Sequence, residues 1–178
     1  MVLEGGCRGG KDDPFIIRIP HLRKGTEQDL VRQTALRARM SMRDLLVYYV
    51  DGGVLERNPS PHGVYFSVQR RTSAHTPYVQ RTIVATRFVV TDFRTNQDAE
   101  WLAVRYALWN AADHGPPGTD VLVFTDSRFV VRQWSGRYRI KIERHKRLQM
   151  HCMGYAKKLG RVVLLWRPRE VMVGVLGH

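Results

Sequence analysis

Two apolar segments, each followed directly by an aspartate, constrain the fold of this chain more than any other feature. Residues 45–50 read Leu-Leu-Val-Tyr-Tyr-Val and precede Asp51, and residues 121–125 read Val-Leu-Val-Phe-Thr and precede Asp126. Neither segment alternates between apolar and polar residues, a pattern typical of a strand covered on both faces of a sheet. In open α/β sheets, ligands bind beyond the carboxyl ends of the parallel strands. We therefore expect both aspartates at one site.

The rest of the chain predicts a mixed sheet with helices packed on its faces. The clearest signal is a helix after Thr95 or Asn96, in which apolar residues recur at helical spacing until Gly115-Pro116-Pro117-Gly118 ends it. Further strands are predicted over residues 63–71, 81–90 and 161–166, and helices over residues 97–114, 127–134 and 143–159. The predicted order is β-β-β-α-β-α-α-β, which belongs to the α/β class.

A third carboxylate belongs with the two aspartates. Glu100 lies at the edge of the apolar stripe of the helix predicted over residues 97–114, and so at the rim of its contact with the sheet. The strands ending at Asp51 and Asp126 contain no lysine or arginine. Because buried carboxylates need a counter-charge, this pattern favours a hard divalent cation bound by the three acids.

Three short motifs carry a resemblance to a known family. They are Tyr49-Val50-Asp51-Gly52-Gly53, Thr95-Asn96-Gln97-Asp98-Ala99-Glu100 and Phe124-Thr125-Asp126-Ser127. They resemble the three acidic motifs of type 1 ribonuclease H, in the same order and on the same elements, and the resemblance covers about residues 45–178. The stretch Gly136-Arg137-Tyr138-Arg139-Ile140-Lys141, followed by one helix, is similar to the reverse-transcriptase-like, phage-like branch.

The resemblance implies both a fold and an activity. The fold would be ribonuclease H-like, with a mixed five-stranded sheet and helices on both faces. The activity would be cleavage of the RNA strand of RNA·DNA hybrids, with two Mg²⁺ or Mn²⁺ ions held by Asp51, Glu100 and Asp126 and with 3′-hydroxyl and 5′-phosphate products. Residues implied to contact the substrate are Gly52, Gly53, Asn96, Gln97, Ser127, Arg137, Lys141 and Arg169.

The fourth acid of the family is where this sequence departs from the pattern. Trp166-Arg167-Pro168-Arg169-Glu170 is similar to the segment that precedes this acid, but no Asp or Glu follows Glu170. Aligning Gly174 with a glycine of phage-like members places His178 at the acid's position. His178 would then ligate a metal or assist proton transfer, and the alternative is a frayed terminal residue without a role.

Positive charge is concentrated at the C-terminal end. Residues 135–178 contain eleven of the 29 lysines and arginines but only two of the 16 acids. A concentrated basic surface attracts a polyanion, so nucleic acid is the expected partner. Charge alone does not separate a nuclease from a binding module. Two alternatives therefore remain: a catalytically weakened module of the same fold, or a related nuclease that acts on DNA.

The sequence also predicts the organisation of the chain. Residues 1–44 read as a basic N-terminal extension, partly flexible, with a helix at 26–41, and residues 45–178 as the catalytic domain. No apolar run approaches the roughly 20 residues that span a bilayer, and no secretory signal is recognisable. We expect a cytoplasmic protein without a membrane partner. The sequence does not identify protein partners.

Overall fold

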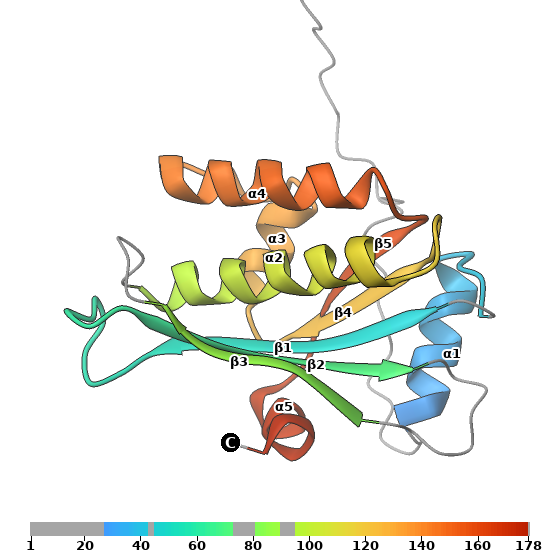
Figure 1. Ribbon diagram of the computed structural model, residues 1–178, viewed down its shortest axis with the longest axis horizontal. Helices are drawn as coiled ribbons and strands as arrows, with labels where there is room; N and C mark the ends of the chain where they lie inside the picture. The colour runs from blue at the N-terminus through green and yellow to red at the C-terminus, as the bar shows by residue number, and fades with distance from the viewer. Residues whose placement is uncertain (1–26, 43–44, 73–80, 90–94, 178) are drawn as a thin grey trace, which may run out of the picture.

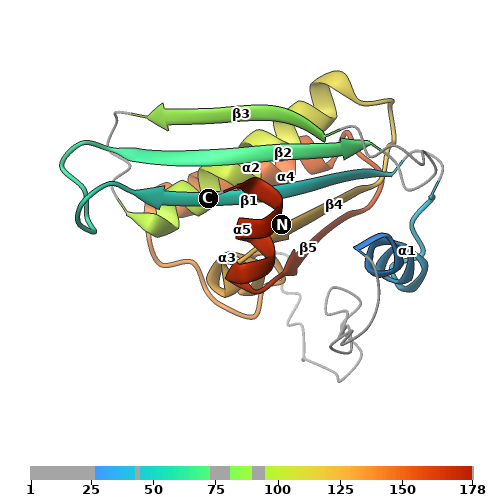
Figure 2. The same cartoon turned by 90° about the horizontal axis from the view of Figure 1, so that it is seen from below.

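The computed structural model describes residues 27–42, 45–72, 81–89 and 95–177. Five strands form one mixed sheet in the order β3-β2-β1-β4-β5, which Figure 2 shows from the side of α5. β1 pairs antiparallel with β2, and β2 with β3, whereas β1, β4 and β5 are parallel. The strands are β1 (Leu46–Val54), β2 (Val64–Thr72), β3 (Arg81–Val89), β4 (Val121–Thr125) and β5 (Val162–Trp166).

Helices cover both faces of this sheet (Figure 1). They are α1 (Glu27–Arg37), α2 (Asn96–His114), α3 (Arg128–Trp134), α4 (Glu143–Ala156) and α5 (Arg169–Leu176). α2 and α3 share one core with the sheet, α4 packs on α2, and α1 and α5 lie on the opposite face. The sheet is therefore the middle layer of the molecule.

Alternating side chains of the central strands explain why both faces are covered. In β1, Tyr48 and Val50 join the core under α2, whereas Val47 and Tyr49 join the core under α1 and α5. All four side chains are at most 4% exposed. On the second face, Tyr49 stacks on Phe124 of β4 with ring centroids 5.0 Å apart. Burial on both sides is what the unbroken apolar pattern of this strand predicts.

Most predicted elements are present, with ends displaced by a few residues. α4 ends at Ala156, earlier than the predicted residue 159. The predicted order was wrong in one respect, because it ended with a strand and omitted α5. This helix starts after Pro168, ends at Gly177 with a positive φ of 86°, and buries Met172. Its shortness and Gly174 weaken the helical pattern, although proline before and glycine after a helix are recognised boundary signals.

The segment before residue 45 contributes to the same core as the sheet. Within the predicted helix at 26–41, α1 buries Leu30, Val31 and Ala35 against residues of β1 and β4. Just beyond α1, the guanidinium of Arg161 donates a hydrogen bond to the carbonyl of Ala38 at 2.7 Å. Residues 1–26 and 43–44 lie outside the described part, so the predicted boundary at residue 44 stays a prediction. No described helix has the length and hydropathy required to cross a membrane.

Candidate metal site

Three carboxylates converge where the parallel pairing of β1 and β4 ends. Val50 and Thr125 are the last paired residues of the two strands, and Asp51 and Asp126 follow them directly. Glu100 reaches the same place from α2. One carboxylate oxygen of each residue lies within 4.8 Å of the others. The structure thus brings together all three acids that the sequence predicted at one site, although β1 continues past Asp51 to Val54.

The start of α2 is fixed by a capping box. The Thr95 hydroxyl accepts a hydrogen bond from the Asp98 main-chain N–H at 3.2 Å, and the Asp98 carboxylate accepts one from the Thr95 N–H at 2.9 Å. This reciprocal pair satisfies two N–H groups that the first helical turn otherwise leaves unpaired. It begins α2 at Asn96, so that Glu100 falls in the second turn, facing the aspartates.

A glycine allows α2 to approach β1 closely enough for Glu100 to reach the site. A Cβ added to Gly52 would lie 2.4 Å from the Ala99 carbonyl carbon and 2.7 Å from the Glu100 main-chain nitrogen. Side-chain carbons do not approach backbone atoms this closely in folded proteins. Gly52, predicted to contact the substrate, therefore also has a packing role, which the sequence alone did not indicate.

Glu100 is strongly affected by its surroundings. Burial, followed by repulsion from Asp126 and then from Asp51, raises the pKa of Glu100 from 4.5 to about 8, against the lowering effect of hydrogen bonds from Ser127 and Thr125. The Thr125 hydroxyl donates to Glu100 Oε2 at 3.3 Å. A carboxyl group held neutral by burial and by neighbouring acids is expected to ionise when a cation enters the cluster.

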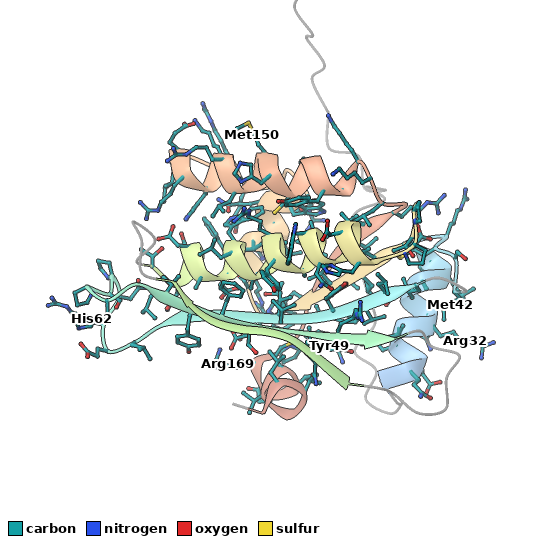
Figure 3. The ribbon with its side chains drawn as sticks, in the orientation of Figure 1. Arg32, Met42, Tyr49, His62, Met150 and Arg169 are labelled. Carbon is teal, nitrogen blue, oxygen red and sulfur yellow. The ribbon has the colours of Figure 1, made fainter. Side chains whose placement is uncertain are left out.

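Asp126 has one satisfied and one unsatisfied carboxylate oxygen. Arg169 Nη1, from the first residue of α5, lies 2.9 Å from Asp126 Oδ2 and 3.7 Å from Asp51 Oδ1. Figure 3 shows Arg169 between α5 and the sheet. Asp126 Oδ1 is buried and has no hydrogen-bond partner. The Trp166 indole N–H donates to the Asp126 main-chain carbonyl at 3.0 Å, which ties this residue to β5.

These observations fit a divalent metal ion. Mg²⁺ and Mn²⁺ prefer oxygen ligands, and carboxylates are their usual protein ligands. A buried acceptor without a partner, such as Asp126 Oδ1, is costly unless a cation or water satisfies it. A cation would also offset the repulsion that raises the pKa of Glu100. Asp51, Glu100 and Asp126 therefore have the chemistry and spacing of a ligand set.

The other predicted site residues differ in exposure and in hydrogen bonding. Asn96 is exposed and its side-chain oxygen accepts a hydrogen bond from the Val54 N–H at 3.1 Å. Ser127 caps α3 by accepting a hydrogen bond from the Val130 N–H. Gln97, Arg137 and Lys141 are exposed, and an added Cβ at Gly53 would meet the Tyr65 hydroxyl. His178 lies outside the described residues. Substrate contacts by these residues stay predictions.

One buried ionic cluster near the site escaped the sequence analysis. Asp98 is fully buried, and its Oδ1 accepts hydrogen bonds from Arg144 Nε at 2.6 Å and from His145 Nε2 at 2.7 Å. The cluster ties the start of α4 to the first turn of α2, two residues before Glu100. The one sequence signal for this cluster was Asp98 itself, because an acid at a helix position that faces the core requires a basic partner.

Replacing Asp98 with asparagine is expected to destabilise the protein by about 2 kcal/mol, because Arg144 and His145 would face a neutral partner in a buried place. Urea unfolding at pH 7 measures this change. Asp113→Asn is the matched control, since Asp113 is an exposed acid on the same helix. Equal effects of the two substitutions would contradict a stabilising role for the cluster.

Glu100→Gln is expected to stabilise the metal-free protein at alkaline pH. Because the pKa of Glu100 is raised in the folded state, its contribution to stability is complete below pH 4.5 and is lost as the pH rises through about 8. Glutamine removes this loss. In EDTA at pH 8.5 we expect the variant to be more stable than wild type by about 2 kcal/mol or more, and by less than about 1 kcal/mol at pH 5. Urea unfolding at both pH values measures the two differences in stability. A variant that is less stable than wild type at pH 8.5 would contradict the expected stabilisation.

The sequence model of a family described as reverse transcriptase-like matches residues 76–173. The N-terminal RNase H domain of a Mycobacterium tuberculosis protein, solved as a fusion with maltose binding protein, is 26% identical with a TM-score of 0.60, covering 72% of this chain and 91% of that one. A comparison with curated protein sequences found no match.

Two further solved structures share the fold at lower identity. RNase H1 from the halophilic archaeon Halobacterium salinarum is 23% identical with a TM-score of 0.58, covering 72% of this chain and 89% of that one. LC11-RNase H1, isolated from compost and solved in complex with an RNA/DNA hybrid, is 23% identical with a TM-score of 0.56, covering 73% and 90%.

Proposed function

The chain belongs to the reverse transcriptase-like family, and from this premise we propose that it is an endonuclease that hydrolyses the RNA strand of RNA·DNA hybrids. It has the ribonuclease H-like fold that the sequence predicted. The observation that carries the proposal is the cluster of Asp51, Glu100 and Asp126 at the end of the β1–β4 pairing. Three acids from three separate segments of the chain, one of them with an unsatisfied buried oxygen, favour a catalytic cation site over a structural one.

Asp51, Glu100 and Asp126 would hold the metal. When bound, two Mg²⁺ or Mn²⁺ ions would supply an activated water and stabilise the leaving oxygen, giving 3′-hydroxyl and 5′-phosphate ends. The chain's own contribution is to keep the three carboxylates in place: the Thr125 hydroxyl orients Glu100, and the Trp166 indole fixes the main chain of Asp126. Glu100 would release its proton as the cation enters, because the neutral form of this carboxyl group is favoured only in the absence of a cation.

Recognition of the hybrid is proposed for residues around the cluster and in the basic C-terminal part. LC11-RNase H1 was solved with an RNA/DNA hybrid, and residues 135–178 of this chain carry eleven basic side chains. We assign the 2′-hydroxyl contact to the start of α2, where Asn96 and Gln97 are exposed beside Glu100. The full proposed set is Gly52, Gly53, Asn96, Gln97, Ser127, Arg137, Lys141 and Arg169, with His178 as a further candidate for catalysis.

A second candidate function is a binding module with weakened catalysis. It is favoured by residues 171–178, which contain no acid where the family pattern has one. The three acids that remain favour the nuclease.

Cleavage of matched substrates tests the proposal. An end-labelled RNA·DNA hybrid, a DNA duplex of the same sequence and a branched DNA are incubated with the protein in Mg²⁺, Mn²⁺ or EDTA. We expect cleavage of the RNA strand alone, only with a divalent ion. Cleavage of either DNA substrate would indicate a related DNA nuclease, and binding of the hybrid without cleavage would support the binding module.

A further inference from the structure

A cation of the chain itself already sits at the carboxylate cluster. Arg169 is the first residue of α5, directly after Pro168. Its Nη1 is 2.9 Å from Asp126 Oδ2 and 3.7 Å from Asp51 Oδ1. Arg169 thus contacts two of the three acids that make up the candidate metal site.

The arginine and the two acids differ in how firmly they are held. The Arg169 side chain is 58% exposed, whereas those of Asp51 and Asp126 are 5% and 9% exposed. The carboxylates are thus fixed by burial, but the guanidinium reaches them from the solvent side on a long side chain. Because the arginine end of these ion pairs is largely exposed, the guanidinium can move into solvent while the main chain of α5 stays in place.

The same two carboxylates, Asp51 and Asp126, would have to serve both cations. Asp126 Oδ2 faces Arg169, while Asp126 Oδ1 is buried and has no partner. A divalent ion bound between the acids would experience repulsion from a guanidinium a few ångströms away. At an effective dielectric constant of about 20, such a repulsion amounts to several kcal/mol before solvent screening reduces it.

We propose that Arg169 is an internal counter-cation of the site, which competes with divalent ions for Asp51 and Asp126 and thereby lowers the metal affinity of the resting protein. The inference rests on the proposed function only in requiring that the acids bind a divalent ion. Once displaced, the guanidinium remains tethered at the rim of the site, where it is available to a phosphate of the substrate.

Mn²⁺ binding without nucleic acid tests the inference. Isothermal titration of the full chain with Mn²⁺ is carried out for wild type, Arg169→Gln, Arg169→Lys and Arg147→Gln. Arg147 is an exposed arginine of α4, so its substitution makes the same change in net charge at a distance from the acids. We expect Arg169→Gln to bind Mn²⁺ about tenfold more tightly than wild type, Arg169→Lys to remain close to wild type because it keeps the charge, and Arg147→Gln to be unchanged.

A second readout follows from the linkage between binding and stability. Tenfold tighter binding makes the Mn²⁺-induced rise in Tm larger for Arg169→Gln than for wild type at the same ion concentration. Equal or weaker Mn²⁺ binding by Arg169→Gln would overturn the inference, as would an equal gain by Arg147→Gln or the absence of binding in all four proteins. If wild type binds Mn²⁺ but does not cut the hybrid, the proposed function fails while the inference is still decided by the affinities.

Discussion

Asparagine in place of Asp126 is expected to lower the rate of hybrid cleavage by about 1000-fold or more. Asp126 is one of the three clustered acids and pairs with Arg169, and its Oδ1 is the buried oxygen without a partner. Asparagine keeps the shape but removes the negative charge, so a divalent ion loses one of its three carboxylate ligands. A loss of about 4 kcal/mol of transition-state stabilisation corresponds to this factor.

Single-turnover cleavage of a labelled hybrid in Mg²⁺ measures the effect, and a gel-shift assay in Ca²⁺ measures binding separately. Hybrid affinity should change by less than about threefold, because the basic residues 135–178 are untouched and phosphate contacts dominate affinity. Asp113→Asn, an exposed acid at the far end of α2, serves as the control. Full activity of Asp126→Asn would exclude the carboxylate cluster as the centre of the reaction.

Alanine in place of Gly52 is expected to destabilise the protein by about 3 kcal/mol and to reduce cleavage by about 100-fold. The added methyl group would lie 2.4 Å from the Ala99 carbonyl carbon, within backbone that cannot move without shifting α2. Overpacking of this kind costs about 1 to 3 kcal/mol. Glu100 moves with α2, and displacement of a catalytic group by about 1 Å lowers rates by about 100-fold.

Gly154→Ala in α4 is the matched control, because nothing lies within 4 Å of an added Cβ there. The same change in that helix should leave activity intact and raise stability by about 0.5 to 1 kcal/mol. Urea unfolding and single-turnover cleavage are measured for both variants. A Gly52→Ala protein as stable and active as wild type would show that α2 and β1 have more freedom than the structure indicates.

The sequence predicted the position of a residue correctly where local chemistry alone determines that position. Asp51 and Asp126 follow fully apolar strands, and the structure places both at the end of the β1–β4 pairing. The helix carrying Glu100 was recognisable from its N-cap and its apolar spacing. These signals depend on local chemistry and on strand direction, both of which are readable from a single chain.

Features that depend on contacts between distant segments were not predictable in the same way. Nothing in the sequence places Arg144 and His145 against Asp98, which precedes them by more than 40 residues. Likewise, the close approach of Gly52 to Ala99 depends on how α2 packs on β1. α5 was missed because a helix of eight residues gives too short a pattern to stand out.

The attachment of α4 to α2 through Asp98 has a consequence for how such a protein can vary over evolutionary time. The outer side of α4 presents side chains such as Met150, which is 62% exposed and points away from the molecule in Figure 3. Substitutions there can change the charge and polarity of the surface without altering the position of Glu100. Arg144 and His145 have no such freedom, since they hold the turn that precedes Glu100. Among proteins with this fold, the residues on the outer side of α4 should therefore vary, whereas those on the side that packs on α2 should be conserved.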